Sequence, residues 1–453
     1  MTRTEAPVTP PVVLTIAGSD SGGGAGIQAD LKTIEAGGAF GTSAITSVTA
    51  QNTTGVESTH VLPTDEIAAQ CGAVRSDFDV AAIKTGMLAT SDVIDIATDA
   101  VRNSDAPAVV DPVMVASSGD RLLEPAAEAA YEDLIAESTL VTPNADEAEV
   151  LTDIEVTDSA RAQQAAEQLV EMGADAALVK GGHVPGDDIV DVLATGDSIE
   201  TVRHTRVDTE ATHGSGCTLS AAIATRLAHG DDLTVAVRTG IDLLARAVRY
   251  NLDVGEGPGA VHHMVAARDQ AERDPTAERV AEVVRQFVRR DVSRLVPEVG
   301  LNVVGATPYA EVPTECAAVE GRITRTLDGV AANRGVRFGA STNVARFLLA
   351  AREFDSDLRF AVNCRVDDEI EAALDALDGT VAEYDPANRP PEAEGQTVEW
   401  AATQAFEASD TTPVAIAGRA GVGWEPTVVV LAPDSATLAD RTIGLLDAVT
   451  DEE

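Results

Sequence analysis

Short apolar runs recur along the first 180 residues and alternate with stretches of helical pattern. The runs occupy residues 12–17, 44–49, 80–84, 108–111, 139–141 and 176–180. Runs this apolar are typical of strands that are buried on both faces, as in parallel sheets. Helical patterns at 27–35, 126–136 and 159–172 lie between them. This alternation predicts an α/β sandwich with a mainly parallel sheet, in which functional loops gather where the strands end.

The chain of 453 residues is long for a single hydrophobic core, so we expect two domains. After about residue 264 a second alternation of strand and helix patterns begins. We expect a tail over 1–11, a first domain over 12–267, a linker region over 268–280 and a second, smaller α/β domain over 281–450. We expect the strands of the second domain at 301–304, 359–362, 414–417 and 427–431, with a strand or loop around 321–324. We expect its helices at 275–290, 342–352, 368–377, 400–406 and 435–446.

The net charge of −43 is extreme, and the 75 acidic residues are spread along the whole chain. Only three of the 32 basic residues are lysines, namely Lys32, Lys84 and Lys180. A folded chain this acidic and poor in lysine is typical of a halophilic, high-salt cytoplasm, where salt screens the self-repulsion. Nucleic acid and anionic membranes are poor partners for such a surface. The beginning lacks an apolar signal segment and the four cysteines have no metal-ligand spacing, so we expect a soluble cytoplasmic protein with reduced thiols.

A glycine-rich turn at 208–217 leads directly into a helical pattern at 218–229 that Gly230 closes. Gly214 and Gly216 permit a tight turn and close approach of a ligand to the backbone. The unpaired amides and the positive dipole end of the helix would face whatever lies over the turn. The sequence therefore suggests a phosphate cradle, although most turns of this kind only join two elements.

The turn resembles the anion-hole motif of ribokinase-like small-molecule kinases. In most of that superfamily the position of Cys217 carries an aspartate, and a cysteine resembles the branch that phosphorylates hydroxymethylpyrimidine and its monophosphate in thiamine biosynthesis. The resemblance implies ATP as phosphate donor, an anion hole at Gly214, Ser215 and Gly216, and Cys217 as the base. At a helix N-terminus we expect Cys217 to have a lowered pKa. The alternative interpretation of Cys217 is a structural one, in which it is only a small residue that caps the helix.

Four further stretches resemble the substrate site of hydroxymethylpyrimidine kinases. The amide of Gln51 offers a donor and an acceptor, which match the nitrogen and amine edge of an aminopyrimidine. A carboxylate such as Asp30 can accept from the amine, and Met87 would form an apolar wall for the ring. The resemblance implies a pyrimidine-binding set of Gly18, Asp30, Gln51, Met87, Asp111 and Val113.

The stretch 142–147 resembles the superfamily's Asn-x-x-Glu element, which organises Mg²⁺ around the phosphates. Mg²⁺ needs few protein carboxylates because it retains several waters. The resemblance implies Glu147 and Asp111 as metal ligands. Asn144 and Glu147 also have the spacing of a capping box at a helix start, and both interpretations can hold together. The nucleotide-binding set is expected to be Asn144, Lys180, Gly182 and Thr212.

The second domain resembles archaeal-type thiamine-phosphate synthase domains in the segments 297–302, 320–323, 336–346 and 421–426. Arg322, Arg337 and Arg346 could bind phosphates of a pyrimidine or thiazole phosphate substrate. Two residues depart from the active pattern: Asn343 replaces a histidine and Trp424 replaces a lysine. Asn cannot act as a proton-transfer group. Two functions therefore remain open, catalytic condensation and noncatalytic sensing of thiamine phosphates.

For the first domain the rival enzyme is a pyridoxal-type kinase, which shares fold and chemistry. A nonenzymatic sugar- or nucleotide-binding relic is the rival from another class. The family resemblance also implies a homo-oligomer.

Overall fold

The computed structural model describes residues 6–114, 123, 125–393, 396–419 and 425–451. The chain divides into two compact units, Met1–Ala267 and Arg268–Glu453. The stretch 268–280, expected as a linker, is helical throughout because it belongs to α9 (Val265–Arg290). Within the second unit Thr307 donates a hydrogen bond to the buried carboxylate of Asp269, and Val280 is part of the core. This part of α9 is therefore packed structure.

A nine-stranded sheet with the order β3-β2-β1-β4-β5-β6-β7-β8-β9 forms the centre of the first unit. Its six inner strands are mutually parallel, and they are β1 (Val12–Asp20), β2 (Phe40–Asn52), β4 (Val80–Thr85), β5 (Ala108–Val110), β6 (Leu140–Val141) and β7 (Ala176–Val179). The other three strands pair antiparallel with their neighbours: β3 (Gly55–Val61) at one edge, β8 (Asp188–Thr195) beside β7, and β9 (Ile199–Thr205) at the other edge. The expected α/β fold with a mainly parallel sheet is confirmed.

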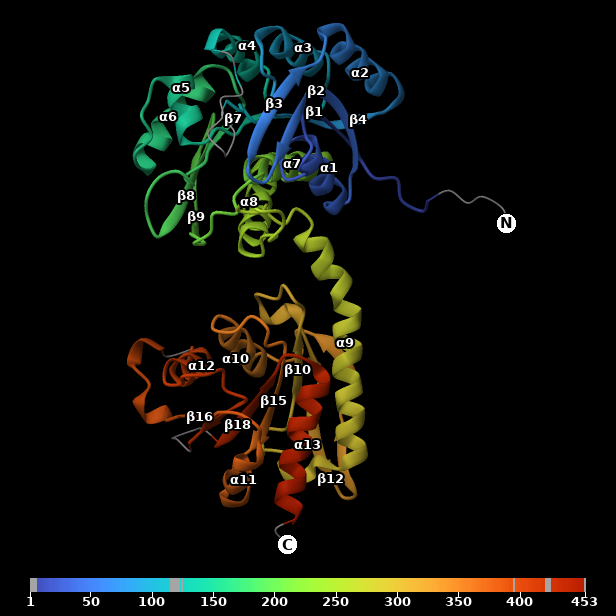
Figure 1. Cartoon of the computed structure of the whole chain (residues 1–453), viewed down its shortest axis with the longest axis vertical. Coiled ribbons are helices and arrows are strands. Elements are labelled where there is room, and N and C mark those ends of the chain that lie inside the picture. The colour runs from blue at the N-terminus through green and yellow to red at the C-terminus, as the bar shows by residue number, and fades with distance from the viewer. Residues whose placement is uncertain (1–5, 115–122, 124, 394–395, 420–424, 452–453) are drawn as a thin grey trace, which may run out of the picture. The chain divides into compact units, whose positions relative to one another are not determined.

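Helices cover both faces of this sheet (Figure 1). One face packs against α2 (Thr64–Asp77), α3 (Ser91–Arg102), α4 (Tyr131–Ala136), α5 (Ala145–Thr152) and α6 (Ser159–Glu171). The other packs against α1 (Gly26–Ala36), α7 (Ser215–Ala228) and α8 (Leu233–Arg249). The helix expected over 126–136 is a 3₁₀ helix at Pro125–Ala130 that continues as α4. Because parallel strands end at the same edge, the loops after β1, β4, β5, β6 and β7 lie on one side of the unit.

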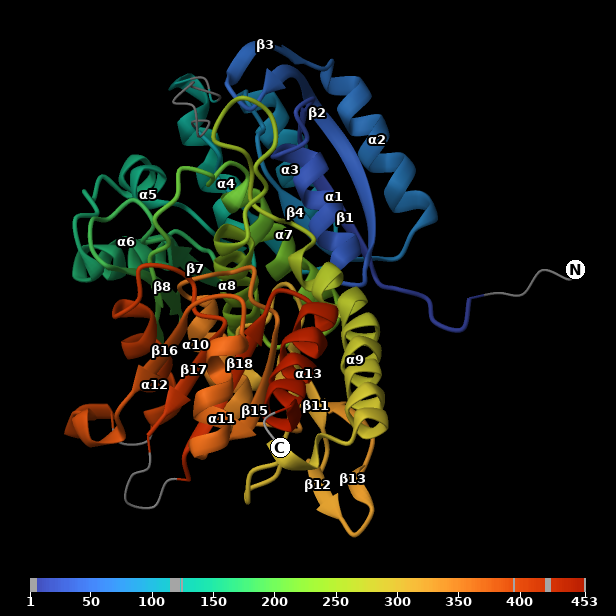
Figure 2. The same cartoon turned by 60° about the horizontal axis from the view of Figure 1, so that its bottom comes forward.

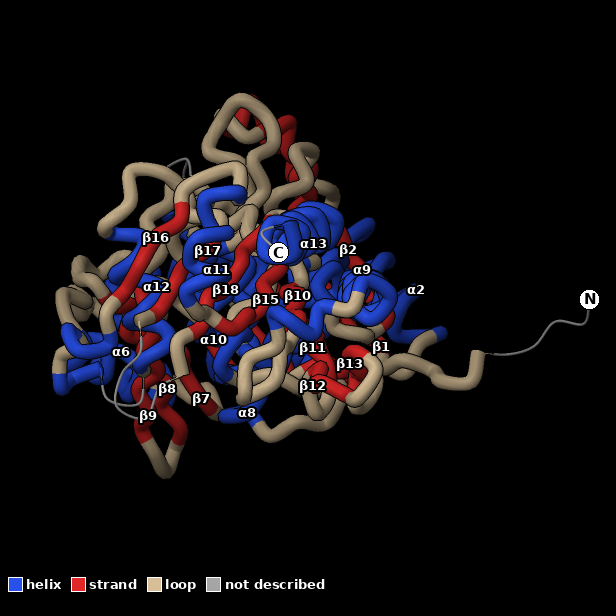
Figure 3. Tube along the Cα trace, turned by 90° about the horizontal axis from the view of Figure 1, so that it is seen from below, coloured by secondary structure: helices blue, strands red, loops and turns tan. Residues whose placement is uncertain are grey.

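The second unit contains a seven-stranded sheet with the order β14-β11-β10-β15-β18-β17-β16. Figure 3 shows most of these strands in sequence across the sheet, from β11 to β16. They are β10 (Val303–Ala306), β11 (Cys316–Val319), β14 (Val336–Phe338), β15 (Phe360–Arg365), β16 (Val381–Tyr384), β17 (Ala415–Gly418) and β18 (Thr427–Ala432). All neighbouring pairs are antiparallel except β16 and β17.

Helices α9, α11 (Asp368–Ala373) and α13 (Ser435–Asp451) pack on one face of this sheet (Figure 2). Helices α10 (Asn343–Arg352) and α12 (Thr397–Glu407) pack on the other. A separate hairpin joins β12 (Ile323–Thr326) to β13 (Gly329–Ala332). Short 3₁₀ helices occur at Val292–Leu295, Pro313–Glu315, Leu374–Ala376, Pro386–Asn388 and Pro391–Ala393. The unit therefore has its own core between a mixed sheet and two helical layers.

Candidate active site

The phosphate cradle that the sequence suggested would lie at the N-terminus of α7. Gly214 adopts φ +82°, and a Cβ at this position would lie 1.8 Å from the carbonyl oxygen of Gly24, so only glycine fits. The amide of Ser215 already donates to the carbonyl of Thr212 at 3.0 Å. The amides of Gly216 and Cys217 are in the first turn of the helix, where no intrahelical acceptor exists. Two amides are therefore available to an anion, fewer than the whole turn that the sequence suggested.

Lys180 brings a positive charge to this cradle. A Cβ on Gly216 would lie 3.4 Å from Lys180 Nζ and 3.3 Å from Asp111 Oδ2. Lys180 Nζ donates to Asp111 Oδ1 at 3.0 Å and lies 4.0 Å from Glu147 Oε2. Burial by itself would lower the pKa of Lys180, but the carboxylates of Asp111 and Glu147 outweigh burial and raise it. The ammonium is therefore a permanent cation beside the free amides.

Asp111 and Glu147 are the two carboxylates of the predicted metal site. Burial, together with the charge of Asp111, raises the pKa of Glu147 to about 7, although Lys180 opposes this. The two buried carboxylates have one nearby cation, Lys180, among the ion pairs of the described residues. Their oxygens are suited to Mg²⁺, which needs few protein ligands. No group of three or more His, Cys, Asp or Glu side chains able to hold a metal occurs among the described residues. The residues therefore fit Mg²⁺ that is completed by phosphates and water.

Asn144 and Glu147 form the expected capping box at the start of α5. The amide of Glu147 donates to Asn144 Oδ1 at 2.8 Å, and the amide of Asn144 donates to Glu147 Oε2 at 2.8 Å. Asn144 also bridges to Lys180 through the backbone, which aligns the two loops. The capping interpretation is observed directly, and the carboxylate of Glu147 also accepts a hydrogen bond from the backbone of Met114.

Cys217 occupies the third residue of α7, but the expectation of a lowered thiol pKa is wrong. Burial raises the pKa of Cys217 to about 11, and the nearby charges of Asp30 and Asp111 act in the same direction. The positive charge of Lys84 and a hydrogen bond from the amide of Gly26 oppose the increase without cancelling it. Desolvation therefore outweighs the favourable position at the helix end. The thiol is mostly protonated at neutral pH.

Asp30 is fully buried and forms an ion pair with Lys84. Lys84 Nζ donates to both carboxylate oxygens at 2.8 Å, and Thr15 Oγ1 donates to Oδ2 at 2.6 Å. Burial by itself would lower the pKa of Lys84, but the charge of Asp30 outweighs it and raises the pKa. Both oxygens of Asp30 are therefore bonded to Lys84. Asp30 has no exposed surface for the substrate contact that the sequence suggested.

Gly18 and Met87, two residues of the expected pyrimidine-binding set, lie next to each other. A Cβ on Gly18 would lie 3.2 Å from Met87 Sδ and 2.8 Å from Ser47 Oγ, so glycine makes room for these side chains. Val113 follows Asp111 after β5 and is half-buried. The next residues, 115–122, lie outside the described part of the chain. Gly18 and Met87 are thus in contact distance of each other, whereas Val113 comes from the neighbouring loop.

A cluster that the sequence analysis did not single out joins the loop after β1 to the loop before α7. Asp20 accepts from the amides of Gly22, Gly24 and Ala25, and His213 Nε2 lies 3.2 Å from Asp20 Oδ2. Gln51 reaches the same histidine at 3.3 Å. His213 could have been identified as a candidate site residue from the sequence, because it directly precedes Gly214 in the glycine-rich turn.

The two remaining nucleotide-site predictions lie on loops. Thr212 is exposed and directly precedes the cradle. Gly182 follows Lys180, and its carbonyl accepts a hydrogen bond from Arg206 at 2.9 Å. Gly182 has open space where a Cβ would lie.

In the second unit the arginines predicted to bind phosphate already have protein partners. Arg322 donates to the carbonyl of Val299, Arg337 pairs with Glu320 at 3.0 Å, and Arg346 pairs with Glu399. Arg322 and Arg337 flank the end of β11, whereas Asn343 and Arg346 lie on α10. The predicted ligand residues therefore come from the loop after β11, from β14 and from α10. Trp424 lies outside the described residues.

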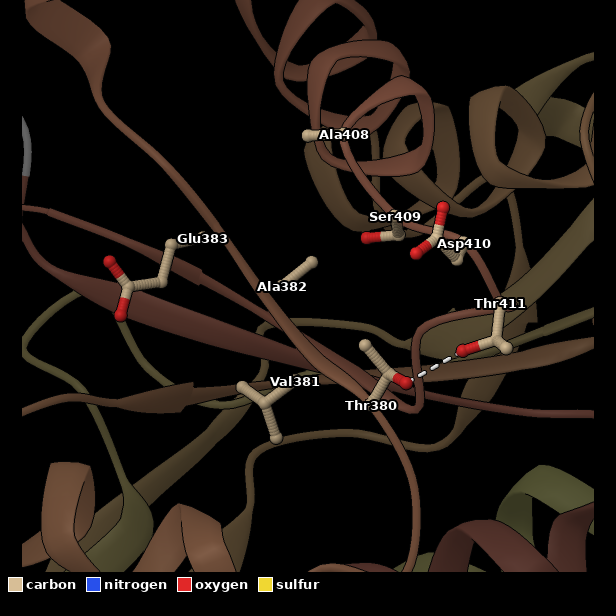
Figure 4. Close-up of a pocket in the computed structure, with 8 residues that line it drawn as sticks. All are labelled: Thr380, Val381, Ala382, Glu383, Ala408, Ser409, Asp410 and Thr411. Atoms are coloured by element: carbon tan, nitrogen blue, oxygen red, sulfur yellow. Dashed lines mark hydrogen bonds between the residues drawn. The ribbon is translucent and has the colours of Figure 1, made fainter.

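Glu425 links two segments of the second unit that the sequence analysis had noted separately. It accepts from the amides of Glu298 and Val299, which connects the end of the 421–426 segment to the 297–302 segment. A cavity of about 510 Å³ lies elsewhere, between β16 and the residues after α12 (Figure 4). It is lined by Thr380, Val381, Ala382, Glu383, Ala408, Ser409, Asp410 and Thr411. None of the predicted ligand residues lines this cavity.

Among the described residues, no helix combines the length and apolar character needed to cross a bilayer.

Each unit matches one known protein family. Residues 20–262 match the family described as phosphomethylpyrimidine kinase, and residues 279–443 match thiamine-phosphate synthase ThiN. The hydroxymethylpyrimidine/phosphomethylpyrimidine kinase of Streptomyces coelicolor is 45% identical over 264 residues, which cover 58% of this chain and 98% of the relative.

Two solved structures resemble the fold of the first unit. Pyridoxal kinase from Staphylococcus aureus in complex with ADP is 32% identical, with a TM-score of 0.55, and covers 58% of this chain and 96% of its own. An ADP complex of Bacillus subtilis pyridoxal kinase is 33% identical, with a TM-score of 0.53, and covers 56% and 98%. Fold alone therefore does not separate the two kinase activities.

Proposed function

This chain belongs to the phosphomethylpyrimidine kinase family, and on that premise we propose that its first unit uses ATP to phosphorylate hydroxymethylpyrimidine and then its monophosphate. The kinase activity itself follows from the family. The observation that carries the proposal is the meeting of the α7 N-terminus with Lys180 and Asp111, because a transferring phosphate needs amide donors and a fixed cation together.

In the proposed reaction the γ-phosphate of ATP lies against the amides of Gly216 and Cys217, with Lys180 beside it. These groups stabilise the charge on the transferring phosphoryl group, and positioning supplies most of the remaining catalysis. Cys217 in its thiolate form accepts the proton of the substrate hydroxyl as the bond to phosphorus forms, and it becomes a thiol. Since its pKa is about 11, the thiolate is scarce at neutral pH but strongly basic when it forms.

Asp111 and Glu147 would hold Mg²⁺ through their carboxylate groups. When bound, Mg²⁺ supplies positive charge that offsets the repulsion between the nucleotide phosphates and the two carboxylates. Lys180, which is paired with Asp111, adds further positive charge beside the phosphates.

The test compares two alcohol substrates of the full chain with ATP and Mg²⁺. Turnover of hydroxymethylpyrimidine with a kcat/KM at least tenfold above that of pyridoxal is expected if the pyrimidine edge is read by Gln51. A higher kcat/KM for pyridoxal would contradict this proposal and would favour pyridoxal kinase activity, the activity named for the similar solved structures. A complete lack of ATP turnover with either alcohol would favour a nonenzymatic binding protein.

For the second unit, the match over residues 279–443 favours a thiamine-phosphate synthase. We propose that it condenses the pyrimidine diphosphate with thiazole phosphate, and noncatalytic sensing of thiamine phosphates is the alternative. Asn343 favours sensing because its amide cannot transfer a proton. Arg337 and Arg346 would exchange their carboxylate partners for phosphate, since both pairs are solvent-accessible.

The two functions of the second unit differ in one measurable product. Incubation of the full chain with hydroxymethylpyrimidine, ATP, Mg²⁺ and thiazole phosphate should yield thiamine phosphate at a rate comparable to the kinase step if the unit condenses them. Accumulation of the diphosphate alone would exclude condensation. A calorimetric titration with thiamine phosphate then separates a sensor, which binds it, from a unit that does neither.

We also propose that the protein works in high salt, because a net charge of −43 destabilises a compact state unless salt screens it. The midpoint of thermal unfolding should rise steadily between about 0.1 and 2 M KCl, well beyond the range in which ordinary surface charges are screened. A midpoint that stays constant over this range would exclude the salt requirement.

A further inference from the structure

His213 lies between two polar side chains and contacts both with the same nitrogen. Its Nε2 is 3.2 Å from Asp20 Oδ2 and 3.3 Å from the terminal amide of Gln51. All three side chains are at least partly buried, so these contacts are not exchanged freely for water. The protonation of one ring nitrogen therefore decides what each neighbour can do.

Asp20 requires that His213 Nε2 carry a proton. Burial by itself would raise the pKa of Asp20, but the hydrogen bonds from His213 and from the amides of Ala25 and Gly22 lower it overall. The carboxylate is therefore ionised and can only accept hydrogen bonds. An unprotonated Nε2 would face it with a lone pair. His213 Nε2 must donate its proton toward Asp20 Oδ2.

A protonated Nε2 has no lone pair left, so the Gln51 atom that faces it must be an acceptor. In the structure Gln51 Nε2 faces His213, and Gln51 Oε1 faces Thr49 Oγ1 at 3.2 Å. An N–H donor then opposes an N–H donor. The oxygen and nitrogen of an amide have nearly the same shape, so a half-turn of the amide exchanges them without moving other atoms. After that turn, the histidine proton is shared between Asp20 and the Gln51 oxygen.

Thr49 independently demands the same half-turn. Its Oγ1 donates to the carbonyl of Ser19 at 2.9 Å, and a carbonyl can only accept. The single hydroxyl proton of Thr49 is thereby used, so Oγ1 can only accept from Gln51. The Gln51 atom next to Thr49 must therefore be the NH₂ nitrogen. The two ends of the amide are thus assigned by different neighbours, and both assignments agree.

From these contacts we propose that His213 and Thr49 are positioning residues that determine pyrimidine specificity by holding the Gln51 amide with its oxygen toward His213 and its nitrogen toward Thr49. The inference rests on the proposed function, in which Gln51 reads the pyrimidine edge. The backbone of Gln51 is fixed as well, because Ser21 Oγ donates to its carbonyl at 2.6 Å and accepts from its amide at 2.8 Å.

The fixed amide selects one order of hydrogen-bonding groups on the substrate. Its second oxygen lone pair accepts from the exocyclic amine, and its second N–H donates to the adjacent ring nitrogen. The 4-oxo analogue of the pyrimidine reverses this order, since its ring nitrogen carries a proton and its exocyclic atom is an acceptor. A free amide would turn over to bind the analogue. The held amide cannot do so without losing its bonds to His213 and Thr49.

The experiment measures the ratio of kcat/KM for the aminopyrimidine alcohol to that for its 4-oxo analogue, with the full chain. We expect a ratio on the order of 100 in the wild type, because two mismatched buried hydrogen bonds oppose the analogue. His213→Leu and Thr49→Val should each lower the ratio about tenfold or more, mainly through KM. His213→Gln and Thr49→Ser retain the needed donor or acceptor and should stay within about threefold of the wild type.

The outcomes separate this inference from the proposed function. A wild type that does not phosphorylate the aminopyrimidine removes the proposed function, whatever the variants do. A wild type that is active and discriminating, with an unchanged ratio in either His213→Leu or Thr49→Val, overturns the inference alone. Equal loss of the ratio in His213→Gln and His213→Leu also overturns it, since that pattern reflects shape. Asp20 retains three amide donors in the His213 variants, so its loop remains held, and the Thr49 pair tests the other end of the amide independently.

Discussion

Cys217 is subject to two opposing electrostatic effects. The helix end and Lys84 favour its thiolate, whereas burial and the carboxylates of Asp30 and Asp111 favour the thiol and win. A base with a pKa well above the working pH is rarely ionised, although its ionised form removes a proton strongly. The residue therefore combines low nucleophilic reactivity at neutral pH with strong basicity in its ionised form.

Replacement of Cys217 tests this role. In Cys217→Ala we expect kcat to fall about 10²–10⁴-fold with little change in the KM for the pyrimidine, as is typical of general-base loss. In the wild type kcat/KM should rise with pH toward the thiol pKa of about 11. Cys217→Asp should shift the flat part of this profile to lower pH, because the ordinary pKa of a carboxyl group lies well below that of a thiol.

Cys71→Ala serves as the control, because Cys71 is buried on α2 in the core and lies in none of the site loops. If Cys217→Ala and Cys71→Ala both retain activity within a few-fold of the wild type, Cys217 has only a structural role in the first turn of α7.

Glu147 predicts a pH dependence of stability. Its pKa of about 7 in the folded protein lies above the ordinary value of 4.5, so the folded state binds more protons than the unfolded state between these values. The free energy of unfolding should therefore fall as pH rises from about 4.5 to 7. Glu147→Gln keeps the capping box and should be more stable than the wild type above pH 7, by up to roughly 2–3 kcal/mol.

Urea unfolding at pH 5 and pH 8 measures this difference, and Glu149→Gln on the exposed side of α5 is the control. Millimolar Mg²⁺ should stabilise the wild type at pH 8 more than Glu147→Gln. Equal responses of the two proteins to pH and to Mg²⁺ would contradict both the raised pKa and the metal assignment.

At the scale of elements, α7 is the helix on which the site depends. Its first turn supplies two amides, and its N-cap Gly214 allows the loop after β1 to approach closely. Its other end is also formed by a glycine with positive φ, Gly230 at +87°. Gly214 and Gly230 therefore have the same left-handed backbone conformation, but only Gly214 has another backbone atom close to the position of a Cβ.

We expect Gly214→Ala to abolish measurable kinase activity, because the new Cβ would collide with the Gly24 carbonyl and displace the cradle. Gly230→Ala meets no atom within 4 Å, so it should cost only the strain of a left-handed residue, about 1–2 kcal/mol, and retain activity. Thermal melting and kinase assays on both variants provide the comparison. A Gly214→Ala enzyme as active as Gly230→Ala would show that the close approach is not required.

At the scale of the whole molecule, the two units have separate sheets and separate cores. The boundary at Ala267 places nearly all of α9 with the second unit. Residues of α9 such as Val283 and Phe287 are buried in that unit's core, and Asp269 is buried with Thr307. A division of the chain should therefore spare α9.

We expect a fragment of residues 1–267 to retain kinase activity within about threefold of the full chain, since all predicted kinase residues lie within it. A fragment 268–453 should unfold cooperatively, whereas 281–453 should be markedly less stable because it lacks Asp269 and Val280. Steady-state kinetics and circular dichroism melts measure these properties. A soluble, folded 1–267 fragment without activity would mean that the second unit contributes to the kinase site.

The sequence by itself was sufficient for the sheet class, the two-part division and the positions of the glycine-rich turns, because these depend on local patterns. Buried parallel strands appear as apolar runs, and a cradle needs glycines at set places. The capping box of Asn144 and Glu147 was visible for the same reason, since its partners are three residues apart.

Tertiary structure decided the electrostatic state of each site residue, because that state depends on partners far away in the chain. Asp30 is 54 residues from Lys84, which occupies both its oxygens, and Gln51 is 162 residues from the histidine that orients it. Cys217 shows the same dependence, since position in a helix favoured a low pKa and burial among distant carboxylates produced a high one. Spacing along the chain determined which residues could meet, and burial and long-range contacts determined their charge, orientation and available hydrogen bonds.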